Sequence, residues 1–384
     1  MPLYIDRVGS VLSEHTDALK QIEAQTQRDL DALRVSLEQF ADMDYASVEE
    51  AIKAIARPGA RPTQEQSTQP MIVPFQNGWQ HHGAARNWAM EQLRDVTTFA
   101  ADGSQITPAR EMSIQVGLVQ IGWFMNYHSH DIPYEKDVAV ELLTPRDFDV
   151  AVDRDTQREV EWRRFNGEVS AIARFMESNS GKEALAFFDG SFIVSFVSGM
   201  QPERQQQYTD VIQYLLDKSE ETRVPLIGFI DNSFSSDVVT LIQHAVGRTQ
   251  IIRNSDALLL RPEMQWGDRS RVYFCSRDDD VVDNNYYERV CITYLKTTRD
   301  NAPARLEFPR WMLDDDIYEW ALDVVRAECV VGVGYPYPLE TADATAVLTM
   351  ADRERFQRMF QQFAEREEIP LRFSRKSMSK RGRR

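Results

Sequence analysis

Thr98-Phe99-Ala100-Ala101-Asp102-Gly103-Ser104-Gln105-Ile106 and Ala186-Phe187-Phe188-Asp189-Gly190-Ser191-Phe192-Ile193 are two nearly matching stretches of this chain. In each, an apolar run typical of a buried strand leads to an aspartate, a glycine and a serine, and the sequence then turns apolar again. Two carboxylates held at matching points of two neighbouring strands can share a divalent cation. We therefore expect Asp102 and Asp189 to lie together in the folded chain.

Asp-Gly between apolar runs is also a strong hairpin signal, because both residues tolerate positive φ. On that interpretation each aspartate closes its own turn, and the two have no common function. Repetition of the whole triplet in the same apolar context favours a shared site. There the glycine permits close approach of backbone, ion or phosphate because it has no Cβ, and the serine can fix the carboxylate rotamer.

The composition is that of a chain with a packed core. Of the 384 residues, 42% are hydrophobic, with 19 Phe, 13 Tyr and 7 Trp, and no apolar run approaches the roughly 20 residues that span a bilayer. The first residues lack the basic start and apolar stretch of a signal peptide. Three cysteines (Cys275, Cys291 and Cys329) have no metal-binding spacing, so we expect reduced core residues in a cytoplasmic protein.

The charge is strongly acidic and unevenly distributed. A formal net charge of -16 excludes a protein that coats nucleic acid by general attraction. Residues 369–384, however, contain seven basic residues and no acidic one. This basic C-terminal tail is either a solvated extension or a local arm that contacts phosphates.

The N-terminal part, residues 1–70, is expected to be a helical extension with a linker. Residues 8–40 have apolar positions three and four apart, which predicts a long amphipathic helix whose narrow seam suits pairing with another helix. Residues 46–56 predict a short helix opened by Ser47 and Glu50 in capping-box spacing. The polar, proline-bearing segment 57–70 predicts a linker.

From residue 71 to 384, helices and strands alternate. We expect helices over 79–93, 158–177, 208–216, 236–246 and 314–329, and further strands over 111–127, 224–230, 271–275 and 289–295. This alternation predicts an α/β fold in which helices flank a mixed sheet. The acidic segment near 128–157, with Pro133 and Pro145, is interpreted as an insertion, and its His128 and His130 as residues of an exposed loop.

The motifs of other chemistries are missing from the sequence. It contains no GxxxxGK[ST], no GxGxxG after a strand, no HExxH and no GxSxG. A metal site built from carboxylate oxygens remains, since Asp102 and Asp189 are hard ligands suited to Mg²⁺ or Mn²⁺. Glu168, on the helix before the second triplet, is either a third acid of this site or a surface residue.

Late in the chain, Gly334-Tyr335-Pro336-Tyr337-Pro338-Leu339 predicts a rigid turn that opens a helix, with Asp343 in its first turns. Two acids on adjacent strands, with one or two more from helices, are the carboxylate pattern of two-metal phosphodiester cleavage. Bound ions screen the acidic site, and the basic tail or a second subunit can supply phosphate contacts.

Further motifs accompany the paired triplets in a fixed order. They are Trp88-Ala89, Arg305-Leu306-Glu307-Phe308-Pro309, the Gly334–Leu339 block, and the ending from Ser374-Arg375-Lys376 to Lys380-Arg381. With them the sequence resembles the NurA nuclease family from about Ala84 to its end. The resemblance implies an RNase H-like domain over residues 71–384.

The resemblance also implies the roles of individual residues. Asp102 and Asp189 would be metal ligands, Glu168 a third ligand, and Tyr335 the functional tyrosine of the family. At Ala342-Asp343 the family usually has Ala-His, so here Asp343 would be the fourth catalytic and metal-binding residue. The metal would be Mn²⁺ or Mg²⁺. The tail residues Arg375, Lys376, Lys380 and Arg381 would bind DNA.

Two functions remain open. The first, implied by the resemblance, is a DNA nuclease with 5′-3′ exonuclease and single-strand endonuclease activity in end resection and double-strand break repair. It would act as a cytoplasmic homodimer together with a HerA-like hexameric ATPase. The second, suggested by the departure at Asp343, is a catalytically weak or inactive module of the same fold that docks on such an ATPase.

Overall fold

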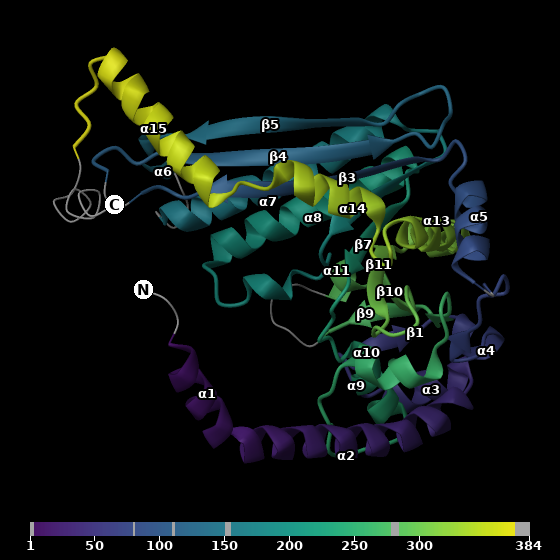
Figure 1. Cartoon of the computed structure of the whole chain (residues 1–384). Helices are drawn as coiled ribbons and strands as arrows, with labels where there is room; N and C mark the ends of the chain where they lie inside the picture. The colour runs from purple at the N-terminus through teal and green to yellow at the C-terminus, as the bar shows by residue number, and fades with distance from the viewer. Residues whose placement is uncertain (1–3, 80, 110–111, 150–154, 278–283, 373–384) are drawn as a thin grey trace. The chain divides into compact units, whose positions relative to one another are not determined.

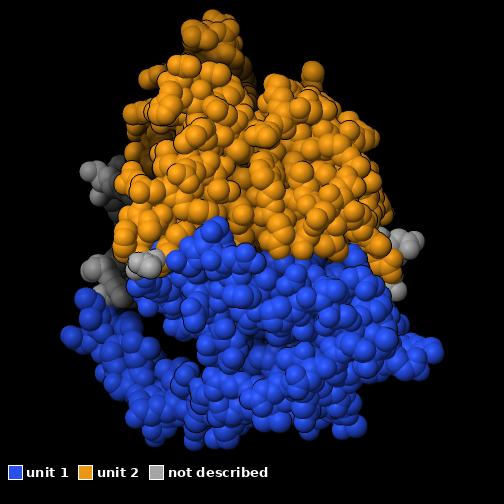
Figure 2. Space-filling view, turned by 90° about the vertical axis from the view of Figure 1, so that its right-hand side faces the viewer, with its two compact units in different colours: residues 1–78, 231–278, 291–305 blue, residues 79–230, 279–290, 306–384 orange. Residues whose placement is uncertain are grey.

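The computed structural model describes residues 4–79, 81–109, 112–149, 155–277 and 284–372. The chain divides into two compact units (Figure 2). Unit 1 comprises residues 1–78, 231–278 and 291–305, and unit 2 comprises residues 79–230, 279–290 and 306–384. Both Asp-Gly-Ser triplets therefore belong to unit 2.

Unit 2 is built on a mixed sheet with the strand order β11-β7-β6-β3-β4-β5 (Figure 1). The strands are β3 Thr97–Ile106, β4 Gly117–Asn126, β5 Glu135–Leu143, β6 Ala184–Asp189, β7 Leu226–Ile230 and β11 Ala304–Pro309, the last entering unit 2 at residue 306. β3, β6 and β7 are parallel, whereas β4 is antiparallel to β3, and β5 to β4. Counted from β3, the first five strands have the order 3-2-1-4-5 of RNase H-like folds, so the predicted fold class is confirmed.

Helices cover both faces of this sheet. α7 (Thr156–Ser178) packs on β3, β4 and β6 and on α8 (Pro202–Thr222), whereas α14 (Tyr337–Ala346) packs on β3, β4 and β5. A Cβ on Gly103 would meet α7, and a Cβ on Gly122 would meet the backbone of α14. Gly103 pairs with Ile121, the neighbour of Gly122. Because successive residues of a strand face opposite sides, α7 and α14 cover opposite faces.

The remaining elements of unit 2 are short connections and outer helices. α13 packs on α5, and Thr349 and Asp352 form a capping box at the start of α15. These elements are α5 His82–Gln92, α6 Pro145–Asp149, the 3-10 helix η1 Val194–Val197, α11 Asn284–Tyr287, α12 Trp311–Asp314, α13 Tyr318–Val331 and α15 Met350–Arg366.

Unit 1 combines helices with small antiparallel pairings, β1 with β9, β9 with β10, β8 with β10, and β2 with β8. A buried ion pair joins Arg269 to Glu65 at 2.7 Å. The helices are α1 Ile5–Glu14, α2 Thr16–Ala41, α3 Tyr45–Ile52, α4 Glu65–Thr68, α9 Asp237–Ala245, α10 Asp256–Leu260 and the 3-10 helix η2 Arg261–Glu263. The strands are β1 Gly59–Pro62, β2 Ile72–Val73, β8 Arg269–Ser270, β9 Tyr273–Ser276 and β10 Val290–Leu295.

The N-terminal helices differ in detail from the prediction. The single helix expected over 8–40 is two helices, α1 and α2, that meet at His15. α1 has no buried residue, and α2 has buried residues only from Leu33 onward. The short helix is α3, and its N-cap is Asp44, whose carboxylate accepts a hydrogen bond from the Ser47 backbone N–H. Asp44 thus takes the capping position that we expected for Ser47.

The segment 57–70 is not a linker in the structure. It contains β1, which pairs with β9, and α4, whose Glu65 and Gln66 are buried. Its polar residues bond within unit 1, which is why a polar composition does not make the segment flexible. The compact units divide after residue 78 rather than 70, and unit 1 also takes in segments from the second half of the chain.

The acidic segment near 128–157 is not a surface excursion throughout. Residues 135–143 form β5, which pairs with β4 from Gly117↔Leu143 to Met125↔Glu135. Only the last residue of β5 is buried, and this exposure explains its charged sequence. The His128 side chain is only 8% exposed rather than on an exposed loop, because it contacts Glu328.

None of the described helices combines the length and apolarity needed to cross a membrane. The three cysteines are reduced and buried, as predicted. The proposed DNA-binding residues Arg375, Lys376, Lys380 and Arg381 lie outside the described residues.

Candidate active site

Asp102 and Asp189 are brought together by the pairing of β3 with β6. The parallel register runs from Thr97↔Ala184 to Ala100↔Phe187. Two residues further along each strand stand Asp102 and Asp189. Asp102 is half-buried, whereas Asp189, the last residue of β6, keeps more solvent exposure.

The glycines of the two triplets are required for different reasons. Gly103 lies inside β3, and a Cβ there would stand 2.5 Å from both Arg164 Cγ and Glu168 Oε1. Gly190 follows the end of β6 and has a φ of 143°, a backbone conformation that favours glycine. Neither triplet forms a two-residue hairpin, since β3 continues through the first triplet and the 3-10 helix η1 follows the second.

The serines hold the segments beyond each triplet rather than their own aspartates. Ser191 Oγ lies 2.9 Å from Glu307 Oε2 and donates to that carboxylate, and the Phe192 backbone N–H donates to the same oxygen at 2.7 Å. Ser104 Oγ accepts a hydrogen bond from the Leu348 backbone N–H at 3.2 Å. Glu307 is fully buried. Its place in the Arg305–Pro309 motif was visible in the sequence, but its contact with Ser191 was not.

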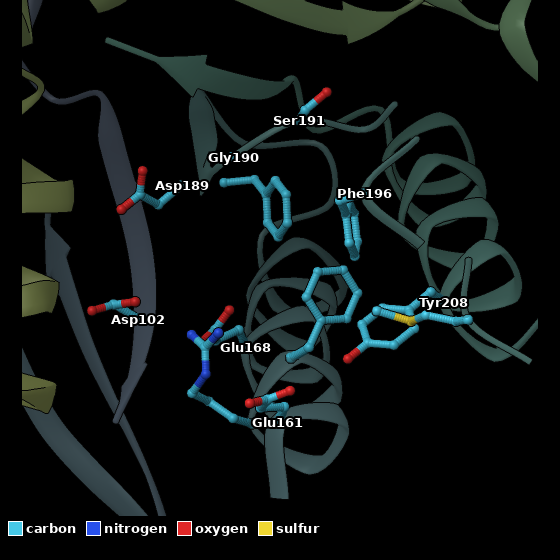
Figure 3. A pocket seen from close by; sticks show the side chains of 12 residues that line it. Asp102, Glu161, Glu168, Asp189, Gly190, Ser191, Phe196 and Tyr208 are labelled. Atoms are coloured by element: carbon cyan, nitrogen blue, oxygen red, sulfur yellow. The ribbon is translucent and has the colours of Figure 1, made fainter. Parts of the chain in front are cut away.

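One pocket of about 460 Å³ contains the acidic residues (Figure 3). Asp102 and Asp189 line it from the sheet, and Glu161 and Glu168 line it from α7. Glu168 is buried, so the structure does not place it on the surface. Arg164, one helical turn before Glu168, donates from Nη1 to Glu168 Oε1 at 2.6 Å.

Two residues of the C-terminal block reach the same carboxylates. The Tyr335 hydroxyl donates to Asp189 Oδ1 at 2.9 Å. Asp343, on α14, lies close enough to Asp102 and Asp189 for its negative charge to raise the pKa of both aspartates. The structure thus gathers Asp102, Glu168, Asp189, Tyr335 and Asp343 in one place, although they come from four separate parts of the sequence.

The carboxylates raise one another's pKa values. The pKa of Asp102 is raised to about 6, mainly by burial. The charges of Asp343 and Asp189 raise it further, whereas a backbone hydrogen bond from Gly103 lowers it. Burial likewise raises the pKa of Glu168 to about 8, although the charge of Arg164 opposes this. Burial also raises the pKa of Asp189, against the hydrogen bond from Tyr335. Carboxylates that resist ionisation together are stabilised by a cation among them.

The donor set fits a hard divalent cation. It consists of carboxylate oxygens, the ligands that Mg²⁺ and Mn²⁺ prefer, and Arg164 is the single Lys or Arg among the described residues that line the pocket. Within the described residues, no three His, Cys, Asp or Glu side chains are placed to hold an ion in this conformation. Binding therefore requires the carboxylates to turn toward the ion.

Comparison with known proteins agrees with the sequence resemblance. The sequence model of the NurA domain family matches residues 96–348. This range contains both triplets, Glu168, Glu307, Tyr335 and Asp343. A comparison with curated protein sequences gave no match.

Several solved structures are similar to the chain. The NurA nuclease from Sulfolobus solfataricus is 14% identical, with a TM-score of 0.48, over 71% of this chain and 85% of that chain. A NurA bound to dAMP and manganese is 7% identical, with a TM-score of 0.34, over 67% and 85%. Endonuclease V from Bacillus subtilis is 12% identical, with a TM-score of 0.32, over 73% and 92%.

Proposed function

The chain belongs to the NurA family of nucleases, and we propose that it is a divalent-metal-dependent deoxyribonuclease that hydrolyses phosphodiester bonds at broken DNA ends. The observation that carries this proposal is the gathering of Asp102, Glu168 and Asp189 in one pocket. Acids that share one pocket and raise one another's pKa values form a functional-site candidate, because a fold does not gain stability from such repulsion.

Asp102, Glu168, Asp189 and Asp343 would hold Mn²⁺ or Mg²⁺. Bound there, such ions would supply activation of water for attack on the phosphorus and stabilisation of the leaving oxygen. The task of the chain is to hold these anionic ligands in place. The hydrogen bond from Tyr335 restrains Asp189, and the ion pair with Arg164 restrains Glu168.

Arg164 also balances charge at the site. In the absence of an ion, its guanidinium is the positive charge in contact with Glu168. The planar guanidinium can equally donate to phosphate oxygens. When Glu168 binds an ion, Arg164 would become available for the phosphate of the DNA backbone.

The family resemblance extends the proposal to substrate and partners. We assign 5′-3′ exonuclease and single-strand endonuclease activity in end resection and double-strand break repair. The enzyme would be a cytoplasmic homodimer that receives DNA from a HerA-like hexameric ATPase. The tail residues Arg375, Lys376, Lys380 and Arg381 would contact DNA phosphates.

A second function is favoured by one observation, the aspartate at position 343. Near pH 7 a histidine can bind a metal through its neutral imidazole or donate a proton as an imidazolium, whereas an aspartate is neither an imidazole ligand nor a proton donor. With Asp343 in place of the usual histidine, the chain would be a weak or inactive module that docks on the ATPase.

A cleavage assay separates the two functions. Labelled single-stranded and blunt duplex DNA would be incubated with the protein in Mn²⁺, Mg²⁺ or EDTA, beside Asp102→Asn and Asp189→Asn. Loss of a residue behind a metal ligand typically lowers activity about 10- to 100-fold, so loss of a ligand itself should lower it at least about 100-fold. Asp137→Asn, which alters an exposed aspartate of β5, is the matched control.

The nuclease requires cleavage that depends on metal, survives in Asp137→Asn and is lost in both site variants. Absence of cleavage by the unaltered protein, with or without an added ATPase, would contradict the nuclease and favour the docking module instead. Asp343→His adds a second comparison. A large gain in rate would show that the aspartate weakens the site.

A further inference from the structure

The pocket that holds the carboxylates has a second side made of aromatic rings (Figure 3). Phe165, Phe196 and Tyr208, here called the aromatic wall, line it together with the acids. Phosphodiester hydrolysis by carboxylates and metal ions does not use these rings. Their presence in the pocket therefore requires a separate explanation.

The aromatic wall is assembled from three elements. Phe165 comes from α7, Phe196 from η1 and Tyr208 from α8. The ring centroids of Phe165 and Tyr208 are 4.9 Å apart, those of Phe196 and Tyr208 are 5.4 Å apart, and those of Phe165 and Phe196 are 6.0 Å apart. Mutual packing fixes the rings before any ligand binds, so a ligand would not have to order them.

Phe196 differs from an ordinary core aromatic residue. Tyr208 is buried, but Phe196 is 49% exposed, and it lines the pocket that contains Asp189. A phenylalanine that only completes a core would be buried on all sides. The exposed ring leaves an aromatic face open beside the acids.

The charges select the kind of group that fits against this wall. Glu161 and Glu168 on α7 also line the pocket, and they repel a second phosphate. Arg164 already contacts Glu168. A flat, uncharged π system suits both the rings and the acidic surroundings, and ligand pockets commonly measure about 300–1,000 Å³, a range that includes this one.

We infer that the aromatic wall is a stacking site for a nucleobase of the DNA strand being cut, with the Phe196 ring as its accessible face. This inference rests on the proposed nuclease function and adds a determinant of its substrate. A base can stack there only when it is unpaired. The site therefore selects single-stranded or frayed ends, and it accepts all four bases because each has a π face.

Abasic substitution tests the site directly. Single-stranded oligonucleotides, each with one tetrahydrofuran nucleotide at a different position, would be cleaved by the protein and by Phe196→Leu. Removal of the stacked base should slow the unaltered protein about 5- to 150-fold at one position relative to the cut. The same removal should have little further effect on Phe196→Leu, and Phe196→Tyr should behave like the unaltered protein.

Phe363→Leu is the matched control, because Phe363 on α15 is 45% exposed and does not line the pocket. This variant should keep the full dependence on the base. If the unaltered protein cleaves DNA but no abasic position slows it, or if the dependence persists in Phe196→Leu, the inference is overturned while the nuclease function stands.

Binding provides a readout that does not need cleavage. An oligonucleotide with a terminal 2-aminopurine would be mixed with protein in EDTA, and stacking should quench its fluorescence for the unaltered protein and Phe363→Leu but not for Phe196→Leu. Quenching without cleavage would support the site and count against the nuclease. Equal fluorescence with all three proteins at saturation would overturn the site.

Discussion

At the scale of single residues, the two Asp-Gly-Ser triplets show what the sequence can predict. The aspartates could be paired in advance, because matched patterns on parallel strands place equivalent residues side by side. The serine contact could not be predicted, since Ser191 bonds to Glu307, 116 residues away. The family resemblance was needed to identify Glu168, because its place on a helix by itself favours a surface residue.

We predict that Glu307 positions Asp189 through Ser191 and Phe192. Glu307→Gln replaces one acceptor oxygen with an amide that donates, so Ser191 Oγ and the Phe192 N–H can no longer share the same carboxylate. The segment after Asp189 should shift. Loss of a residue that orients a metal ligand typically weakens metal binding about 10- to 100-fold. We expect the Mn²⁺ concentration for half-maximal cleavage to rise by that factor.

Ser191→Ala removes the other partner of this contact and serves as the comparison. If Glu307 acts through Ser191, the double variant should need little more Mn²⁺ than Glu307→Gln alone. Full additivity, or an unchanged Mn²⁺ requirement with only a lower melting temperature, would show a purely structural role.

His128 and Glu328 form a buried pair that responds to pH. His128 Nε2 lies 3.3 Å from Glu328 Oε1, and Thr98 Oγ1 donates to the same oxygen at 2.7 Å. Glu328 Oε2 has no hydrogen-bond partner among the described residues. Burial lowers the pKa of His128, but Glu328 and the Val96 carbonyl raise it more, so the net pKa is raised.

The raised pKa fixes the sign of the pH dependence. Stabilisation by this pair is complete below the unfolded histidine value of about 6.5 and is lost as the pH rises through the folded value. His128→Asn removes one partner and tolerates the φ of 45°. Urea unfolding should show a deficit of about 3–5 kcal/mol at pH 6 that shrinks toward pH 9. A deficit that is constant over this range would refute the ion pair.

At the scale of helices and strands, exposure decided which predictions failed. β5 begins with three charged residues and is almost wholly exposed, so its composition resembles that of a loop. Pairing with β4 was not visible in the sequence. β5 is an edge strand, held by backbone hydrogen bonds on one side only, and such bonds do not require apolar side chains. The buried strands β6 and β7 were recognisable because both faces are covered and their residues are apolar throughout.

Close approach of α7 to β3 depends on Gly103. In Gly103→Ala, the added methyl would meet Arg164 Cγ and Glu168 Oε1 at 2.5 Å, so both side chains must move. We expect a loss of about 1–3 kcal/mol in unfolding free energy, together with weaker Mn²⁺ binding. Urea unfolding and calorimetric titration measure the two effects.

Gly9→Ala is the comparison, since a Cβ at Gly9 meets no atom within 4 Å. It should leave both quantities nearly unchanged. Mn²⁺ binding by Gly103→Ala equal to that of the unaltered protein would mean that Glu168 does not take part in the metal site.

At the scale of the whole molecule, charge and chain order are the informative features. Composition indicated an acidic protein with a basic tail. The linker that it predicted over 57–70 was wrong, because this segment forms β1 and α4 of unit 1. Unit 1 is built from three separate segments, and pairings between distant segments leave no periodic pattern in a sequence.

The basic tail should contribute to DNA binding through phosphates. Replacing Arg375, Lys376, Lys380 and Arg381 with glutamine should weaken single-strand binding and lower the slope of log affinity against log salt by up to about 3, since each phosphate contact contributes about 0.7. Fluorescence anisotropy over a salt series measures the slope.

A second quadruple glutamine variant controls for general charge. It changes exposed basic residues elsewhere in the chain, Lys20, Arg28, Lys53 and Arg355. Its slope should match that of the unaltered protein. Equal slopes for both quadruple variants would remove the tail from the DNA-binding surface.

The account depends most on a cation shared by the carboxylates of β3 and β6, and Mn²⁺ binding tests this without reference to catalysis. Free Mn²⁺ would be followed by electron paramagnetic resonance during titration of the protein, Asp102→Asn, Asp189→Asn and the control Asp137→Asn. We predict saturable binding that weakens at least about 100-fold in each site variant and is unchanged in the control. Full-strength binding by either Asp102→Asn or Asp189→Asn would contradict a shared site.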